Sequence, residues 1–141
     1  MNRLPRREVL RRSIVGGSIA AVGSALAGCV AEAPDGDVRV TDDLTFEPET
    51  FEIDAGETVT WVNVGRNDHT VTAFEGEIPD EAAYFASGGF ESEEVAREAY
   101  PEGALGNHDT FEHVFEASGE YRYFCVPHEG AQRGTIIVSD R

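Results

Sequence analysis

Short segments in which every second residue is apolar or aromatic constrain the fold of this chain most. Phe111, His113 and Phe115 occupy alternate positions of one such segment. Further segments with turn residues nearby are 38–46, 51–53, 58–64, 69–74, 119–125 and 134–139. Successive side chains of a strand point to opposite faces, so a period of two indicates strands with one buried face. Several short strands at this spacing predict an antiparallel sandwich or barrel.

Residues 75–108 break the strand pattern. We expect helices at Pro79–Ala86 and Ser92–Tyr100, with Ser92 as the N-cap of the second and Pro101 as its stop. The fold class predicted is therefore all-β, with a short helical excursion between strands.

The N-terminus is typical of an export signal. Residues 1–28 combine a basic head with an apolar, small-residue run, and the Arg6-Arg7 pair resembles a twin-arginine signal. Leu26-Ala27-Gly28-Cys29 resembles a lipobox, which would make Cys29 the lipidated first residue. One alternative is that the apolar run stays as a membrane anchor, although its 15 residues are fewer than the ~20 that a spanning helix needs. The other alternative is that Cys29 is an unmodified cysteine.

This organisation predicts three parts of the chain. They are a signal peptide at 1–28, a lipidated tether at 29–37 and one folded domain at 38–141. We expect the domain to be exported and held by its lipid on the outer face of the cell membrane.

The charge balance is strongly acidic. The chain has 27 Asp plus Glu against 11 Arg and no Lys, and without residues 1–28 it keeps 26 acids against 6 Arg. Such a surface repels nucleic acid, whose phosphates need basic partners. High net charge is also a property of disordered chains, but the regular strand pattern favours a folded protein. We expect a halophilic protein, since concentrated salt screens self-repulsion between surface carboxylates.

Three residues form a candidate copper site. If Cys29 carries lipid, Cys125 has no cysteine partner in an oxidising compartment, and metal ligation is one reason to keep such a thiol. Cys125 and His128 lie in one short loop stiffened by Pro127, and His69 begins a separate expected strand. A Cys with two His is the trigonal ligand set of blue-copper electron-transfer sites.

The same stretches resemble the cupredoxins, and most closely the halocyanin and plastocyanin group. The matching motifs are Phe46-Glu47-Pro48, Ala55–Trp61, Asp68–Thr72, Phe85–Gly88, Thr110–Phe115 and Gly119–Gly130. The resemblance covers about residues 38–139 and implies a Greek-key β-sandwich with one copper ion per chain. It implies that His69, Cys125 and His128 are the three strong ligands.

The chain departs from that family at the fourth, axial ligand. The family usually places a methionine after the second histidine, whereas this chain has Gln132 and its single methionine is Met1. Three interpretations stay open: Gln132 is an axial amide ligand, a backbone carbonyl near Asp68 or nothing takes that position, or the site has lost its redox use.

These features predict a function class. We expect a membrane-tethered electron carrier, a monomer that exchanges electrons with redox partner proteins. The alternatives are copper storage or delivery without redox traffic and a degenerate cupredoxin. We do not expect an enzyme, because copper enzymes with such domains add histidine clusters, and this chain has four His in all.

Overall fold

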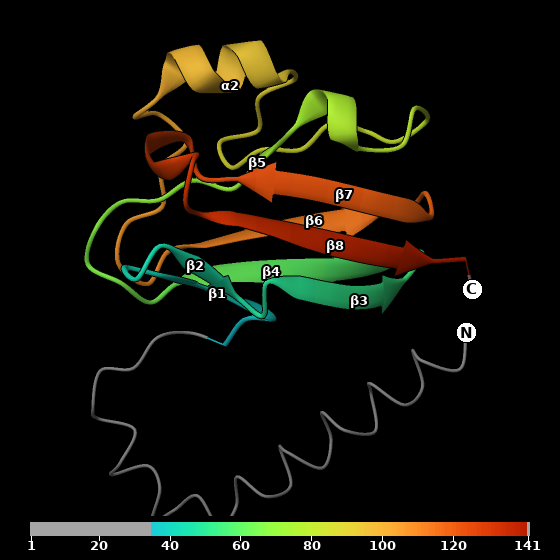
Figure 1. Ribbon diagram of the computed structural model, residues 1–141, viewed down its shortest axis with the longest axis horizontal. Coiled ribbons are helices and arrows are strands. Elements are labelled where there is room, and N and C mark those ends of the chain that lie inside the picture. The colour runs from blue at the N-terminus through green and yellow to red at the C-terminus, as the bar shows by residue number, and fades with distance from the viewer. Residues whose placement is uncertain (1–34, 141) are drawn as a thin grey trace, which may run out of the picture. The chain divides into compact units, whose positions relative to one another are not determined.

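The computed structural model describes residues 35–140. These residues form two four-stranded sheets, whose strands are labelled in Figure 1. The first sheet has the order β2-β1-β4-β6 and consists of β2 (Thr45–Glu47), β1 (Val38–Thr41), β4 (Glu57–Asn63) and β6 (Thr110–Phe115). The second has the order β3-β8-β7-β5 and consists of β3 (Thr50–Asp54), β8 (Arg133–Ser139), β7 (Gly119–Phe124) and β5 (Thr72–Ala73).

The predicted β-sandwich is confirmed, and its pairing is more varied than the purely antiparallel description. β4 pairs with β6, and β7 with β8, in antiparallel register. β1 pairs in parallel with β4, and β3 in parallel with β8. Because β1 and β3 each join a strand that is distant in sequence, the N-terminal quarter of the domain ties both sheets to later strands.

The core lies between the sheets and is aromatic. Trp61 is fully buried and packs edge-on against Tyr123, at 5.5 Å between ring centroids. Phe85, which belongs to the 75–108 excursion between β5 and β6, stacks on Trp61. Tyr121 and Tyr123 belong to this core, as the alternation in β7 predicts.

The excursion contains one α-helix in place of the two expected. α2 (Glu93–Ala99) begins after Ser92, whose side chain accepts a hydrogen bond from the backbone N–H of Val95, so the predicted N-cap is confirmed. The expected helix at Pro79–Ala86 is wrong. That stretch forms turns and bends after η1 (Glu75–Glu77), and the backbone at Phe85 and Ser87 bonds to the β5 region instead.

Two expected strands are shorter than their patterns. Residues 38–46 form β1 and β2 rather than one strand, because a turn with Leu44 at φ 65° folds β2 back onto β1. The expected strand at 69–74 narrows to β5, and His69 lies just before it in a bridge with Leu105. Backbone hydrogen bonds between His69 and Leu105 thus hold the His69 segment against the 75–108 excursion.

Residues 1–34 lie outside the described residues. The predicted signal peptide, Cys29 and most of the tether fall there, so they stay predictions. Within residues 35–140, no helix is long and apolar enough to cross a membrane.

Candidate metal centre

Three predicted ligands converge at one end of the sandwich. Cys125 follows β7, His128 ends η2 (Val126–His128), and His69 comes from the loop after β4. Their ligand atoms all lie within 4.8 Å of one another. Cys125 Sγ is 3.5 Å from His128 Nδ1 and 3.8 Å from His69 Nδ1. The structure therefore brings together residues that are 56 positions apart in sequence.

Backbone hydrogen bonds hold the loop of Cys125 and His128. The backbone N–H of His128 donates to the carbonyl of Cys125 at 3.0 Å, and that of Gln132 donates to the carbonyl of His128 at 2.8 Å. Cys125 N–H donates in turn to the carbonyl of Gln132 at 3.1 Å. These bonds close the loop on itself, so its side chains are placed before any metal binds.

Thr70 connects this loop to the His69 segment. Its hydroxyl accepts a hydrogen bond from the backbone N–H of Val126 at 2.8 Å, and its own backbone N–H points at Cys125 Sγ at 3.4 Å. A donor aimed at the sulfur stabilises the thiolate. Thr70 was not predicted as a residue of the centre, although it directly follows His69.

Cys125 is fully buried. Burial raises the pKa of its thiol, and the Thr70 N–H opposes this rise. Without a cation the sulfur therefore stays protonated at neutral pH, whereas a metal ion would take the proton's place and hold the thiolate.

Gln132 lies at the same centre, as its position in the loop suggested. Its side chain is fully buried, and Oε1 is 2.9 Å from His69 Nδ1. Its amide Nε2 donates to the backbone carbonyl of Thr45 at 2.9 Å and to that of Thr41 at 3.3 Å. Because the nitrogen faces two acceptors, the oxygen must face the ligands.

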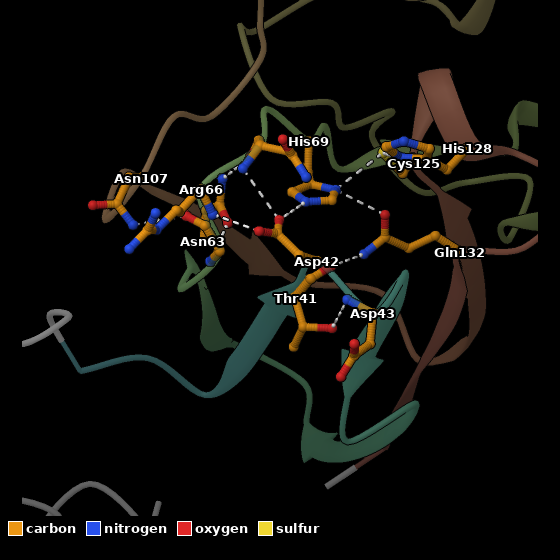
Figure 2. Close-up of polar contacts among 12 residues, drawn as sticks. Thr41, Asp42, Asp43, Asn63, Arg66, His69, Asn107, Cys125, His128 and Gln132 are labelled. Carbon is orange, nitrogen blue, oxygen red and sulfur yellow. Dashed lines mark hydrogen bonds and ion pairs between the residues drawn. The ribbon is translucent and has the colours of Figure 1, made fainter.

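The carboxylate of Asp42 contacts the nitrogen of the His69 ring that faces away from Cys125. Asp42 Oδ1 is 2.9 Å from His69 Nε2, and Figure 2 marks this contact with a dashed line. Bonds from His69 and from the backbone N–H of Arg66 lower the pKa of Asp42 to about 2, so its carboxylate is an acceptor only. Nε2 therefore carries the hydrogen, and Nδ1 keeps its lone pair toward Cys125 and Gln132.

Two further residues of the first sheet have different roles. Asn63 supports the His69 loop, since its amide donates to the carbonyls of Asn67 at 2.9 Å and Leu105 at 2.7 Å. His113 lies away from the centre, stacked on Phe85 at 4.8 Å between rings. It is therefore a packing residue, as expected from its position beside Phe111 and Phe115.

The donor set fits copper. Two imidazole nitrogens and a buried sulfur converge, which is the His₂Cys set typical of blue-copper proteins. The lone pair of His69 Nδ1 also faces the Gln132 oxygen at 2.9 Å, an arrangement of two acceptors that a cation between the ligands would satisfy. Hard cations such as Mg²⁺ prefer oxygen ligands and do not fit this set.

Comparisons with known proteins also indicate copper. The family model for copper binding proteins of the plastocyanin/azurin family matches residues 35–139. The plastocyanin of Scenedesmus fuscus is 40% identical over 96 residues, which cover 67% of this chain and 87% of the relative. The chloroplastic plastocyanin of Chlamydomonas reinhardtii is 35% identical over 130 residues, which cover 89% and 79%.

Solved structures give the same fold. A purple cupredoxin from Nitrosopumilus maritimus aligns with a TM-score of 0.55 at 26% identity, over 74% of this chain and 100% of its own. A copper-containing nitrite reductase from Thermus scotoductus aligns with a TM-score of 0.57 at 21% identity, over 79% of this chain and 24% of its own. The second likeness concerns the fold alone.

Proposed function

Since the chain belongs to the plastocyanin/azurin family of copper-binding proteins, we propose that it is a one-electron carrier whose copper is held by His69, Cys125 and His128. The observation that carries this proposal is the convergence of Sγ and two Nδ1 atoms within 4.8 Å. Bound copper supplies the redox chemistry by alternating between Cu(II) and Cu(I).

The protein's own contribution is to keep the ligands in place. Cys125 and His69 are fully buried, so little water can reorganise around them. Hydrogen bonds from the loop backbone and from Thr70 fix the donor atoms. A centre that changes little between oxidation states exchanges electrons readily, which is the requirement for a carrier.

Gln132 is proposed as the axial ligand through Oε1. Its amide is held by the carbonyls of Thr41 and Thr45, so the oxygen needs no rearrangement to face a metal. An amide oxygen is a harder donor than a thioether, and it favours Cu(II). We therefore expect a lower reduction potential than a methionine at this position would give.

His128 is proposed as the point where electrons enter and leave. It is the one ligand of the three that is partly exposed, whereas His69 and Cys125 are buried. A redox partner protein that docks over η2 could approach the copper through this imidazole.

The cellular setting is proposed from the sequence. The signal-like residues 1–28 and the lipobox-like Cys29 support export and a lipid anchor on the outer face of the membrane. The acidic surface supports a high-salt habitat. We expect a monomer that is not an enzyme and that exchanges electrons with redox partner proteins.

Three measurements separate this function from its alternatives. A carrier gives reversible one-electron voltammetry and keeps its copper against a mild chelator. A storage or delivery protein would release copper to the chelator, and an enzyme would turn over oxygen or nitrite. Irreversible voltammetry of a protein that has bound copper would contradict the proposal.

A single variant tests the axial ligand. Gln132→Ala removes the amide oxygen while leaving Cys125, His69 and His128 in place. If Gln132 is a ligand, the electron paramagnetic resonance spectrum and the reduction potential both change. If both stay the same, the centre is three-coordinate or uses a backbone carbonyl.

A further inference from the structure

We propose that Asp42 is a positioning residue for the metal centre, which fixes the His69 ring and biases bound copper toward Cu(II). This inference rests on the proposed copper site and deepens it. Its basis is a hydrogen-bonded contact of 2.9 Å between Asp42 Oδ1 and His69 Nε2, on the side of the ring opposite the ligand atom.

The local structure holds the Asp42 carboxylate at this ring. The backbone N–H of Arg66, labelled in Figure 2, donates to Asp42 Oδ2 at 2.7 Å. The backbone N–H of Asn67 donates to Asp42 Oδ1 at 3.1 Å. Gly65 makes room for it, because a Cβ at Gly65 would overlap the Asp42 carboxylate. The loop that precedes His69 is therefore shaped around Asp42.

The same turn also holds the proposed axial group. Asp42 lies between β1 and β2, and the carbonyls that orient the Gln132 amide belong to Thr41 and Thr45 at the ends of that turn. One short connection thus orients two groups of the centre, one through a carboxylate and one through backbone carbonyls.

The chemical consequence follows from charge. A carboxylate that accepts the Nε2 hydrogen makes the imidazole a better donor at Nδ1. It also places a negative charge one side chain away from the metal, which stabilises Cu(II) more than Cu(I). The side chain of Asp42 is 35% exposed, so solvent screens part of this effect.

The test compares Asp42→Asn with Asp43→Asn in the full chain. Both remove one charge from the same turn, but His69 Nε2 bonds to Asp42 and not to Asp43. Loss of such an outer partner lowers metal affinity by about 10- to 100-fold. We expect the Cu(II) affinity of Asp42→Asn to fall about tenfold more than its Cu(I) affinity, which raises the potential by ~59 mV.

A second variant separates the hydrogen bond from the charge. Gly65→Ala keeps the carboxylate but pushes it from its position, so it should raise the potential in the same direction as Asp42→Asn. In Cu(I)-loaded protein, which is diamagnetic, the Nε2 hydrogen of His69 should give a slowly exchanging NMR signal that Asp42→Ala abolishes.

The outcomes distinguish this inference from the proposed function. If wild type shows no reversible potential, the proposed function fails. If wild type cycles but Asp42→Asn and Asp43→Asn have equal potentials, the positioning role of Asp42 is wrong. A change in stability without a change in potential would also overturn it, because that is the result of a structural role alone.

Discussion

At the scale of single residues, the amide of Gln132 determines the character of the centre. Its nitrogen is saturated by the carbonyls of Thr41 and Thr45, and its oxygen faces His69. A thioether in the same place would be a softer donor and would leave those two carbonyls without the amide hydrogens.

Gln132→Met should therefore have two opposite effects. The reduction potential should rise, because a thioether favours Cu(I) relative to an amide oxygen. The free energy of unfolding should fall by about 0.5–1.5 kcal/mol, because the carbonyls of Thr41 and Thr45 each lose one hydrogen bond from the amide. Voltammetry and urea unfolding measure the two effects, and an unchanged potential would contradict an axial role for Gln132.

His113 should make stability depend on pH. Burial lowers the pKa of this histidine, which stacks on Phe85. The folded state therefore resists a proton that the unfolded chain accepts, and stability falls as pH drops below about 6.5. We therefore expect wild type to lose more unfolding free energy than His113→Phe when the pH falls from 7.5 to 5.5. Urea unfolding of both proteins at the two pH values measures this difference.

Sequence reasoning located some residues of the centre but not others. Cys125, His128 and Gln132 lie within eight positions, so their spacing alone suggested a common site. Asp42 lies 27 positions before His69 in an acid-rich sequence. Nothing in that pattern distinguishes it from the other surface carboxylates, and only the folding of β2 back onto β1 brings it to the ring.

At the scale of elements, α2 is tied to the ligand loop. Arg97 donates to both oxygens of Glu129 at 2.7 and 3.1 Å, and to Glu93 of its own helix at 2.8 Å. Its guanidinium also lies 4.4 Å over the ring of Phe124, next to Cys125. Since Glu129 follows His128, these contacts brace the exposed side of the loop.

Glu129→Gln should accelerate copper loss. A part-exposed ion pair contributes about 0.2–1 kcal/mol, so we expect the dissociation rate in the presence of a chelator to rise by up to about fivefold. Glu98→Gln, which removes an exposed carboxylate of α2, is the matched control and should behave as wild type. Equal rates for both variants would mean that the ion pair does not brace the loop.

The stabilising effect of this pair should vanish in acid. The Arg97 guanidinium lowers the pKa of Glu129, so the carboxylate form is favoured in the folded state. The contribution is complete above about pH 4.5 and is lost as pH falls through the lowered pKa. The difference in unfolding free energy between wild type and Glu129→Gln should shrink accordingly.

Element boundaries were predicted less well than element types. Alternation identified β4, β6, β7 and β8 because those strands are six or seven residues long, enough for a period of two to be recognised. Residues 38–46 keep a similar pattern through a reversal at Leu44, which alternation cannot reveal. Residues 79–86 have helical composition, but Phe85 is drawn into the aromatic core by Trp61 and Phe115.

At the scale of the whole molecule, charge should govern stability. Without residues 1–28, 26 acidic residues against 6 Arg repel one another on a small domain, and salt at 1 M reduces the screening length to about 3 Å. The free energy of unfolding should therefore rise between 0.1 and 2 M KCl, as measured by thermal or urea unfolding.

A charge-reduced variant is the control for this prediction. Glu91, Glu94, Glu98 and Glu102 are exposed in or near α2, and changing all four to Gln should weaken the salt dependence. A stability that is independent of KCl, or equally dependent in the variant, would contradict the role assigned to the acidic surface.

The most direct test of the central claim is the optical and electron paramagnetic resonance spectrum of the Cu(II)-loaded protein in concentrated KCl. An intense visible thiolate-to-copper band with narrow copper hyperfine splitting, both lost in Cys125→Ser, is the predicted result. A pale spectrum of ordinary cupric type, unchanged in Cys125→Ser, would contradict the claim that His69, Cys125 and His128 form an electron-transfer centre.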